Sequence, residues 1–148
     1  MAAVLIDTNV LVYAHDQGEF AKQAQAIRVL DHLQLTGNGR LSAQSLAEFF
    51  HATTRGARPL LTVEEATQQV EWLSHAWPVL DITHLVVLEA ARGVRDHKLA
   101  YWDAQLWATA HLNQIPVIFS EDFNPGAVLE GVRFVNPFSA DFVLEAWA

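Results

Sequence analysis

Short apolar runs alternate with longer, helix-like stretches along this chain. Residues 3–6 and 116–119 are continuous apolar runs bounded by polar positions, which is typical of buried strands. Shorter runs predict further strands at 40–42, 79–80 and 132–135. The intervening stretches predict helices over 9–15, 19–35, 45–54, 62–77, 83–95 and 100–113. Thr62 and Glu65 have the spacing of a capping box, and Thr83 is a good cap for the helix that follows it.

Strands that alternate with helices are joined by right-handed crossovers, which produce a mostly parallel sheet covered on both faces. The sequence therefore predicts an α/β fold with three layers, α/β/α, around a mostly parallel central sheet. No internal repeat, low-complexity tract or Pro/Gly/Ser-rich linker divides the chain. We therefore expect a single domain over residues 1–148.

Composition narrows the class of protein. Hydrophobic residues make up 51% of the 148 residues and charged residues 18%, so the chain is apolar enough to fold around its own core. The absence of cysteine excludes disulfide scaffolds, thiolate zinc sites and iron–sulfur clusters. No apolar run approaches the roughly 18 residues of a membrane helix, and the start of the chain lacks the basic region of a signal peptide. We expect a cytoplasmic protein with no membrane partner.

The charge balance is acidic. Lys and Arg number 9 against 17 Asp and Glu, which gives a formal net charge of -8. A protein whose main work is gripping DNA is normally basic. The balance argues against such a protein, but it is compatible with an enzyme that touches a few phosphates or whose acids hold metal ions.

Acidic residues follow two of the predicted strands directly. Asp7 comes after the run 3–6, and Glu121 and Asp122 follow 116–119 with only Ser120 between. Ligands of parallel sheets bind beyond the carboxyl ends of the strands, so these acids are candidates for a site. The alternative is that strand ends are often polar and that Asp7 merely caps a helix.

Asp103 is distinguished by its neighbours on the predicted helix 100–113. At about 100° per residue, Trp102, Leu106, Trp107 and Ala110 lie around it, whereas Gln105 and Thr109 face away. The pattern therefore predicts a carboxylate that points into an apolar face, where it needs a cation, a donor or a proton. The alternative is an acid in the first turn that complements the helix dipole.

Glu48 has the opposite pattern. The inward face of its helix is defined by Leu46, Phe49, Phe50 and Thr53, and Glu48 lies away from that face. Taken alone, this position is more typical of a solvated surface. If Glu48 nevertheless joined the other acids at one sheet edge, four carboxylates would repel one another unless divalent cations lay among them. Hard oxygen ligands suit Mg²⁺ or Mn²⁺, which can activate water for attack on a phosphodiester.

Four short motifs occur in one order along nearly the whole chain. They are LIDTNVL at 5–11, SAQSLAEF at 42–49, LAYWDAQL at 99–106 and FSEDF at 119–123, followed by GVRFVNPF at 131–138. In these residues the chain resembles the PIN-domain ribonucleases and, within them, the VapC-like toxins of type II toxin–antitoxin pairs. The resemblance implies a metal-dependent endoribonuclease that hydrolyses RNA with metal-activated water.

The resemblance also assigns roles to residues. It implies that Asp7, Glu48, Asp103 and Asp122 are the catalytic acids and the ligands of Mg²⁺ or Mn²⁺. It also implies that the hydroxyls of Thr8 and Ser120 support the acidic site and that Asn9 helps to hold the first turn. Glu121 is expected to face away, and Asp96 is a weaker accessory candidate. A small cognate antitoxin, an RNA substrate and a homodimer are the implied partners.

Basic and aromatic residues add secondary candidates. Arg55 and Arg58 follow the Glu48 helix, and a second basic group leads into Asp103, namely Arg92, Arg95, His97 and Lys98. We consider Arg55, Arg58, Arg95 and Lys98 as possible RNA contacts, with helix-dipole complementation and plain solubility as the alternative. The scattered histidines do not have zinc-site spacing. The spacing of Trp72, Trp77, Trp102 and Trp107 is typical of packing residues.

Other functional classes stay open at this stage. One is a signalling domain that holds Mg²⁺ and accepts a phosphoryl group on Asp7, although acids on helices fit it poorly. Another is a phosphatase with an Asp nucleophile, but the second Asp that such chemistry generally needs is replaced by Asn9. A third is an inactive PIN-like relative that serves only as a Mg²⁺-binding or interaction module.

Overall fold

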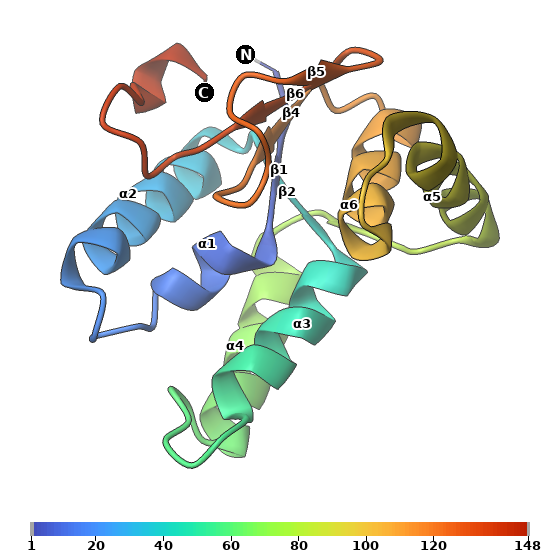
Figure 1. The fold of residues 1–148 in the computed structure, drawn as a ribbon. Helices are drawn as coiled ribbons and strands as arrows, with labels where there is room; N and C mark the ends of the chain where they lie inside the picture. The colour runs from blue at the N-terminus through green and yellow to red at the C-terminus, as the bar shows by residue number, and fades with distance from the viewer. Residues whose placement is uncertain (1, 148) are drawn as a thin grey trace.

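A six-stranded sheet forms the centre of the computed structural model, which describes residues 2–147 (Figure 1). The strands lie in the order β3-β2-β1-β4-β6-β5. They are β1 (Val4–Ile6), β2 (Gly39–Ser42), β3 (Val79–Leu80), β4 (Val117–Phe119), β5 (Val128–Leu129) and β6 (Val132–Val135). All neighbouring strands are parallel except β5, which pairs antiparallel with β6.

The helices begin and end close to the positions that the sequence predicts. They are α1 (Thr8–Tyr13), α2 (Phe20–Thr36), α3 (Ala43–Thr54), α4 (Val63–Ala76), α5 (His84–His97), α6 (Tyr101–Leu112) and the 3-10 turn η1 (Leu144–Ala146). Thr62 and Glu65 form the predicted capping box of α4, and Thr83 caps α5. Ser42 caps α3 by accepting the backbone N–H of Ser45.

Alternation along the strands separates two apolar cores. On β1, Val4 and Ile6 pack with α1, α2, α3 and α4, whereas Leu5 between them packs with α5 and α6. Successive strand residues point to opposite faces, so one short apolar run supplies both cores. Figure 1 shows α5 and α6 on one side of the sheet, α1 and α2 on the other, and α3 and α4 below the sheet, where β2 leads into α3. The predicted three-layer α/β/α fold with a mostly parallel sheet is confirmed.

Two sequence predictions about elements were wrong. The hairpin strand β5 was missed, because this short edge strand is formed by its antiparallel pairing with β6 across the turn at 130–131. The predicted inward face of α6 was also wrong: Gln105 and Thr109 are buried, and Trp102 is 64% exposed. The reason is that α6 is buried from Ala104 to Ala110, so its helical period does not mark a single apolar side.

The packing interpretation of the tryptophans holds for only part of the set. Trp77 and Trp107 are buried, but Trp72 and Trp102 are exposed. Trp77 packs so tightly on β2 that a Cβ placed on Gly39 would meet its ring at 2.0 Å. Within residues 2–147 no helix combines the length and apolar character needed to cross a bilayer.

Candidate active site

Asp7 lies directly after β1 and is held by the neighbouring strand. Its backbone N–H donates to the carbonyl of Phe119 at 3.0 Å, which extends the pairing of β1 with β4 by one residue. Its carboxylate caps α1 by accepting the Thr8 N–H at 2.7 Å, and it accepts the Ser120 hydroxyl at 2.6 Å. The capping role expected as an alternative is therefore real, but it uses only part of the carboxylate.

The carboxyl of Asp7 has an unusual proton affinity. Its pKa is raised to about 6, mainly by burial and to a smaller extent by the nearby carboxylates of Asp122 and Glu48. Hydrogen bonds from Ser120 and from the Thr8 backbone act in the opposite direction. Loss of hydration is therefore only partly compensated, and the group is poised to take up a proton or a cation.

The two acids in the turn after β4, Glu121 and Asp122, have different partners. The backbone N–H of Asp122 donates to the Ser120 hydroxyl at 3.1 Å, so this hydroxyl links Asp122 to Asp7. Glu121 turns the other way and pairs with Lys22 at 2.6 Å, where it also accepts the Tyr13 hydroxyl. The expectation that Glu121 faces away is confirmed.

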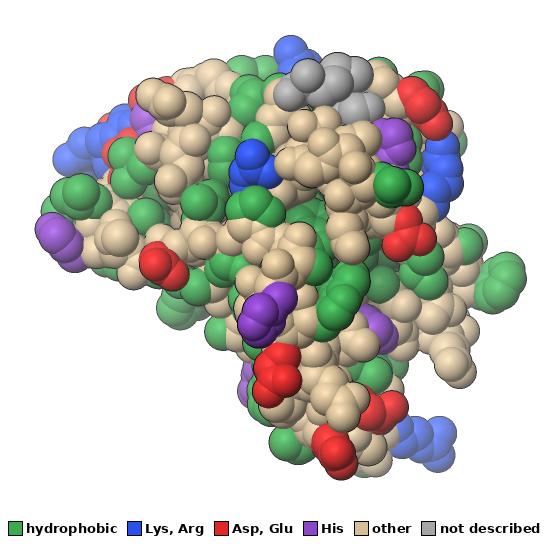
Figure 2. Space-filling model, turned by 180° about the vertical axis from the view of Figure 1, so that it is seen from behind, with side chains coloured by type: hydrophobic (Ala, Val, Ile, Leu, Met, Phe, Trp, Pro, Cys, Tyr) green, Lys and Arg blue, Asp and Glu red, His purple; other side chains and the backbone are tan. Residues whose placement is uncertain are grey.

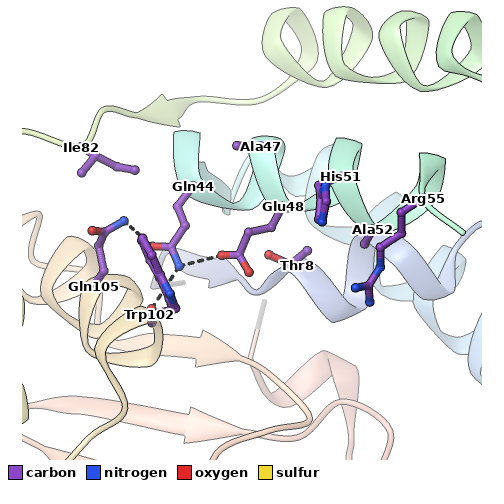
Figure 3. A pocket seen from close by; sticks show the side chains of 10 residues that line it. All are labelled: Thr8, Gln44, Ala47, Glu48, His51, Ala52, Arg55, Ile82, Trp102 and Gln105. Atoms are coloured by element: carbon purple, nitrogen blue, oxygen red, sulfur yellow. Dashed lines mark hydrogen bonds between the residues drawn. The ribbon is translucent and has the colours of Figure 1, made fainter.

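Glu48 extends from the exposed side of α3 but has a fixed orientation. The side-chain amide of Gln44 donates to Glu48 Oε1 at 2.7 Å and to the Trp102 carbonyl at 3.0 Å (Figure 3). Gln105 donates in turn to Gln44 Oε1 at 2.9 Å and accepts the Tyr101 hydroxyl at 2.9 Å. This chain of polar groups ties α3 to α6 and aims Glu48 at the carboxyl edge of the sheet.

Sequence reasoning missed this chain. Gln44 precedes Glu48 by one helical turn, and that spacing is the only signal that could have indicated the contact. Gln105 was assigned to an outward face, and its bond to Gln44 depends on how α3 and α6 pack.

Asp103 lies in the first turn of α6 and is partly buried. Burial raises its pKa, and the carboxylates of Asp122 and Glu48 add to the rise. For both Asp7 and Asp103, burial is a larger cause of the raised pKa than repulsion between the carboxylates. The four acids thus interact in pairs across the edge formed by β1, β4, α3 and α6.

The donor set suits a hard divalent cation. In residues 2–147 no three His, Asp or Glu side chains are gathered tightly enough to form a ready metal cage. The site nevertheless offers four carboxylates that repel one another. It also holds two buried oxygens beside Asp7, Thr8 Oγ1 and Asn9 Oδ1, for which the described residues supply no hydrogen-bond partner. Oxygen ligands of this kind fit Mg²⁺ or Mn²⁺.

A cavity of about 550 Å³ adjoins the acids. Thr8 and Glu48 line it, so it opens directly onto the acidic edge. Figure 3 shows the other lining residues, which are Gln44, Ala47, His51, Ala52, Arg55, Ile82, Trp102 and Gln105. The cavity therefore combines small apolar walls, one large aromatic ring and one guanidinium.

The four basic candidates separate in the structure. Arg55 lines the cavity, and Arg58 is exposed in the loop that follows α3. Arg95 pairs with Asp96 at 2.8 Å, which removes Asp96 from the acidic site, and Lys98 donates to the Arg95 carbonyl. On the face shown in Figure 2, basic side chains are scattered among neutral and acidic ones. This scatter agrees with the net charge of -8.

Comparison with known proteins gives one sequence match. A model of the PIN domain family matches residues 4–128, which covers most of the chain. A search of curated protein sequences found no match. The matched segment includes all four candidate acids. It also includes β1 and β4, the two strands at the centre of the sheet.

Several solved structures have the same fold. A toxin–antitoxin complex from Klebsiella pneumoniae aligns with a TM-score of 0.66 and 18% identity, over 91% of this chain and 98% of that chain. DNA-bound VapBC from Salmonella typhimurium aligns with a TM-score of 0.65 and 17% identity, over 93% of this chain and 99% of that chain. VapC20 from Mycobacterium tuberculosis is described as a sarcin–ricin loop cleaving toxin. It aligns with a TM-score of 0.65 and 18% identity, over 86% of this chain and 98% of that chain. At such identities the likeness establishes the fold.

Proposed function

The chain belongs to the PIN domain family, and from that premise we propose that it is a Mg²⁺- or Mn²⁺-dependent endoribonuclease that acts as the toxin of a toxin–antitoxin pair. One observation carries the proposal. The carboxyl of Asp7 is buried at the carboxyl end of β1 beside the carboxylates of Asp122 and Glu48, and burial raises its pKa to about 6. Strongly perturbed acids that face one another in a cleft are characteristic of functional sites.

Asp7, Glu48, Asp103 and Asp122 are the residues that would hold the metal. When bound, a divalent cation lowers the pKa of water so that it can attack the phosphorus, and it stabilises the charge on the leaving oxygen. The protein supplies orientation. Ser120 and the Thr8 backbone fix the Asp7 carboxylate, and the Gln44 amide fixes Glu48, so little rearrangement is needed when substrate arrives.

The partners follow from the same premise. Toxins that cut cellular RNA must be held inactive, and two of the similar structures are toxin–antitoxin complexes. We therefore expect a small antitoxin that covers the acidic edge, with an Arg or Lys against the carboxylates. We also expect a homodimer, as the family resemblance implies. In a supporting experiment, expression of the chain alone is expected to arrest growth, and co-expression with a small protein encoded by a neighbouring gene is expected to relieve the arrest.

The decisive experiment measures cleavage of single-stranded RNA by the purified protein with Mg²⁺, with Mn²⁺ and with EDTA. We expect cleavage with either metal and none with EDTA. Asp7→Asn keeps nearly the same volume but removes the negative charge, and it is expected to lower the rate by at least about a hundredfold. Glu121→Gln is the matched control, because Glu121 lies next to Asp122 in sequence but pairs with Lys22. Cleavage that survives EDTA, or full activity of Asp7→Asn, would exclude the proposal and favour a binding module.

A further inference from the structure

Trp102 presents a large apolar ring to solvent beside the acidic edge. Its side chain is 64% exposed, whereas Trp77 and Trp107 are almost fully buried. Its position is fixed, because its carbonyl accepts the Gln44 amide and its ring lies edge-on to Tyr101, with centroids 5.0 Å apart at 85°. An exposed indole that is held in one orientation offers a flat apolar face on which a planar ligand can stack.

The cavity beside Trp102 is continuous with the acidic site. Thr8, which follows Asp7, and Glu48 both line it, so an occupant would lie next to the carboxylates (Figure 3). Its walls include small apolar side chains from Ala47 and Ala52. Arg55 extends from the end of α3 and supplies a positive charge at the same cavity.

We propose that this cavity receives one unstacked nucleobase of a single-stranded RNA, which stacks on Trp102 while Arg55 contacts a neighbouring phosphate. The inference rests on the proposed function and adds the way in which substrate is held. Single-stranded RNA is commonly bound by stacking of splayed bases on aromatic rings, with basic side chains along the backbone. Figure 3 draws Glu48 and Thr8 between Trp102 and Arg55, so the ring contact and the phosphate contact lie on either side of the acidic residue that lines the cavity.

The glutamine side chains that line the cavity are already hydrogen-bonded within the protein. Gln44 uses its amide nitrogen for two hydrogen bonds, to Glu48 and to the Trp102 carbonyl, so it has no hydrogen left to donate to a base. Gln105 is buried and engaged with Gln44 and Tyr101. The two glutamine amides therefore contribute little to base recognition, and stacking on Trp102 is the main contact that we expect for the base.

The first arm of the test measures binding of fluorescein-labelled, single-stranded RNA by anisotropy in EDTA, which keeps the RNA intact. Trp102→Ala is expected to weaken binding by about tenfold, since stacking on an aromatic side chain contributes roughly 1–3 kcal/mol per base. Trp102→Phe is expected to restore most of the affinity. Trp72→Ala is the matched control, because Trp72 is also exposed, at 51%, but lies outside this cavity.

The second arm scans the RNA with single abasic nucleotides. In the wild-type protein one abasic position is expected to lose about the same factor as Trp102→Ala, and in Trp102→Ala that position is expected to lose nothing further. Arg55→Ala is expected to weaken binding and reduce its salt dependence, whereas Arg58→Ala serves as the control outside the cavity. With active protein, Trp102→Ala is expected to raise KM about tenfold with little change in kcat.

The outcomes separate this inference from the proposed function. If no RNA is cut but the abasic position still couples to Trp102, the ribonuclease proposal fails and the nucleobase site stands. If RNA is cut and Trp102→Ala binds and cleaves like Trp72→Ala, the nucleobase site is excluded and the ribonuclease proposal stands. Unchanged RNA binding together with lost antitoxin binding in Trp102→Ala would also overturn the inference and assign the cavity to a protein partner.

Discussion

Two groups of acids in this protein have opposite electrostatic surroundings. We call one group the edge acids, which are Asp7, Glu48, Asp103 and Asp122. We call the other group the hairpin acids, because Glu89 and Asp96 lie on α5 and Glu130 lies in the turn of the β5–β6 hairpin. Burial raises the pKa of Asp7 to about 6 and also raises that of Asp103. Hydrogen bonds from Arg92 and His97 lower the pKa of Glu130 to about 2.

The difference comes from partners, because the residue types are the same. Each hairpin acid meets a guanidinium or an imidazole. Glu89 pairs with Arg92 at 2.7 Å and with His111 at 2.6 Å, and Glu130 pairs with Arg92 at 2.9 Å. Asp7 instead receives only neutral donors and faces other carboxylates. A surface acid that is already paired has little to offer a new cation, whereas an unpaired, buried acid has a strong tendency to bind one.

The largest expected effect is on activity. Asp103→Asn removes one edge acid and is expected to lower RNA cleavage by at least about a hundredfold, because charge at the reacting site is lost. Glu130→Gln removes a hairpin acid and is expected to leave the rate within about twofold. Initial rates with Mg²⁺ and a single-stranded RNA measure both variants. Equal losses in the two variants would mean that the distinction between the groups has no functional meaning.

The next effect concerns stability and pH. The folded-state pKa of Asp7 is raised from 3.8 to about 6, so between these values the folded protein holds a proton that the unfolded chain has lost. Its contribution to stability is therefore greatest below about pH 4 and is lost as pH rises through about 6. Without metal, Asp7→Asn avoids this loss. We expect the variant to be more stable than wild type by about 1–3 kcal/mol at pH 8 and nearly equal at pH 4.

Denaturant unfolding in EDTA, followed by circular dichroism at both pH values, measures this difference. The comparison between variant and wild type cancels titration of the acids that lie far from Asp7, which both proteins share. Glu121→Gln is the control. This variant is not expected to gain stability at pH 8, because the substitution removes the ion pair with Lys22. A variant that is equally stable or less stable at both pH values would contradict the view that Asp7 is unfavourably buried.

A smaller effect is expected from metal binding. For a dissociation constant of about 1 mM, 5 mM Mg²⁺ stabilises the folded state by about 1 kcal/mol, which corresponds to roughly 2–5 °C in Tm. Thermal melts with and without Mg²⁺ are expected to show this rise for wild type and for Glu130→Gln. Asp7→Asn is expected to lose most of it. A rise that persists in Asp7→Asn would place the cation elsewhere.

The smallest effect lies in the hairpin acids themselves. Glu130 is partly exposed, with 34% of its side chain accessible, so solvent screens its ion pairs. Its folded-state pKa is depressed from 4.5 to about 2, so its stabilising contribution is present above about pH 4.5 and is lost as pH falls toward 2. Glu130→Gln is expected to cost less than about 1 kcal/mol at pH 7 and less still in 1 M NaCl. Denaturant unfolding at the two salt concentrations checks this, and a salt-independent cost would indicate lost packing instead of lost charge.

Much of the fold could be predicted because local patterns encode it. The strands at 4–6 and 117–119 are short, β-branched apolar runs followed by polar residues, and the caps at Thr62 and Thr83 depend on residues within one turn. The placement of Asp7 and Asp122 at one sheet edge also followed, because parallel strands end together. The metal-binding and catalytic roles of the four acids stay predictions.

By itself the sequence determined the alternation of strands and helices, the layers and the acids that follow β1 and β4. Only the tertiary structure decided the surroundings of α6 and α3. A helical period can indicate one apolar side, but α6 packs against α5, β4 and β6 and meets Gln44 of α3. Its buried polar face and the exposed ring of Trp102 therefore depend on contacts between residues far apart in the chain. Glu48 is aimed at the site for the same reason, since the contacts of Gln44 with Trp102 and Gln105 exist only when α3 and α6 are docked.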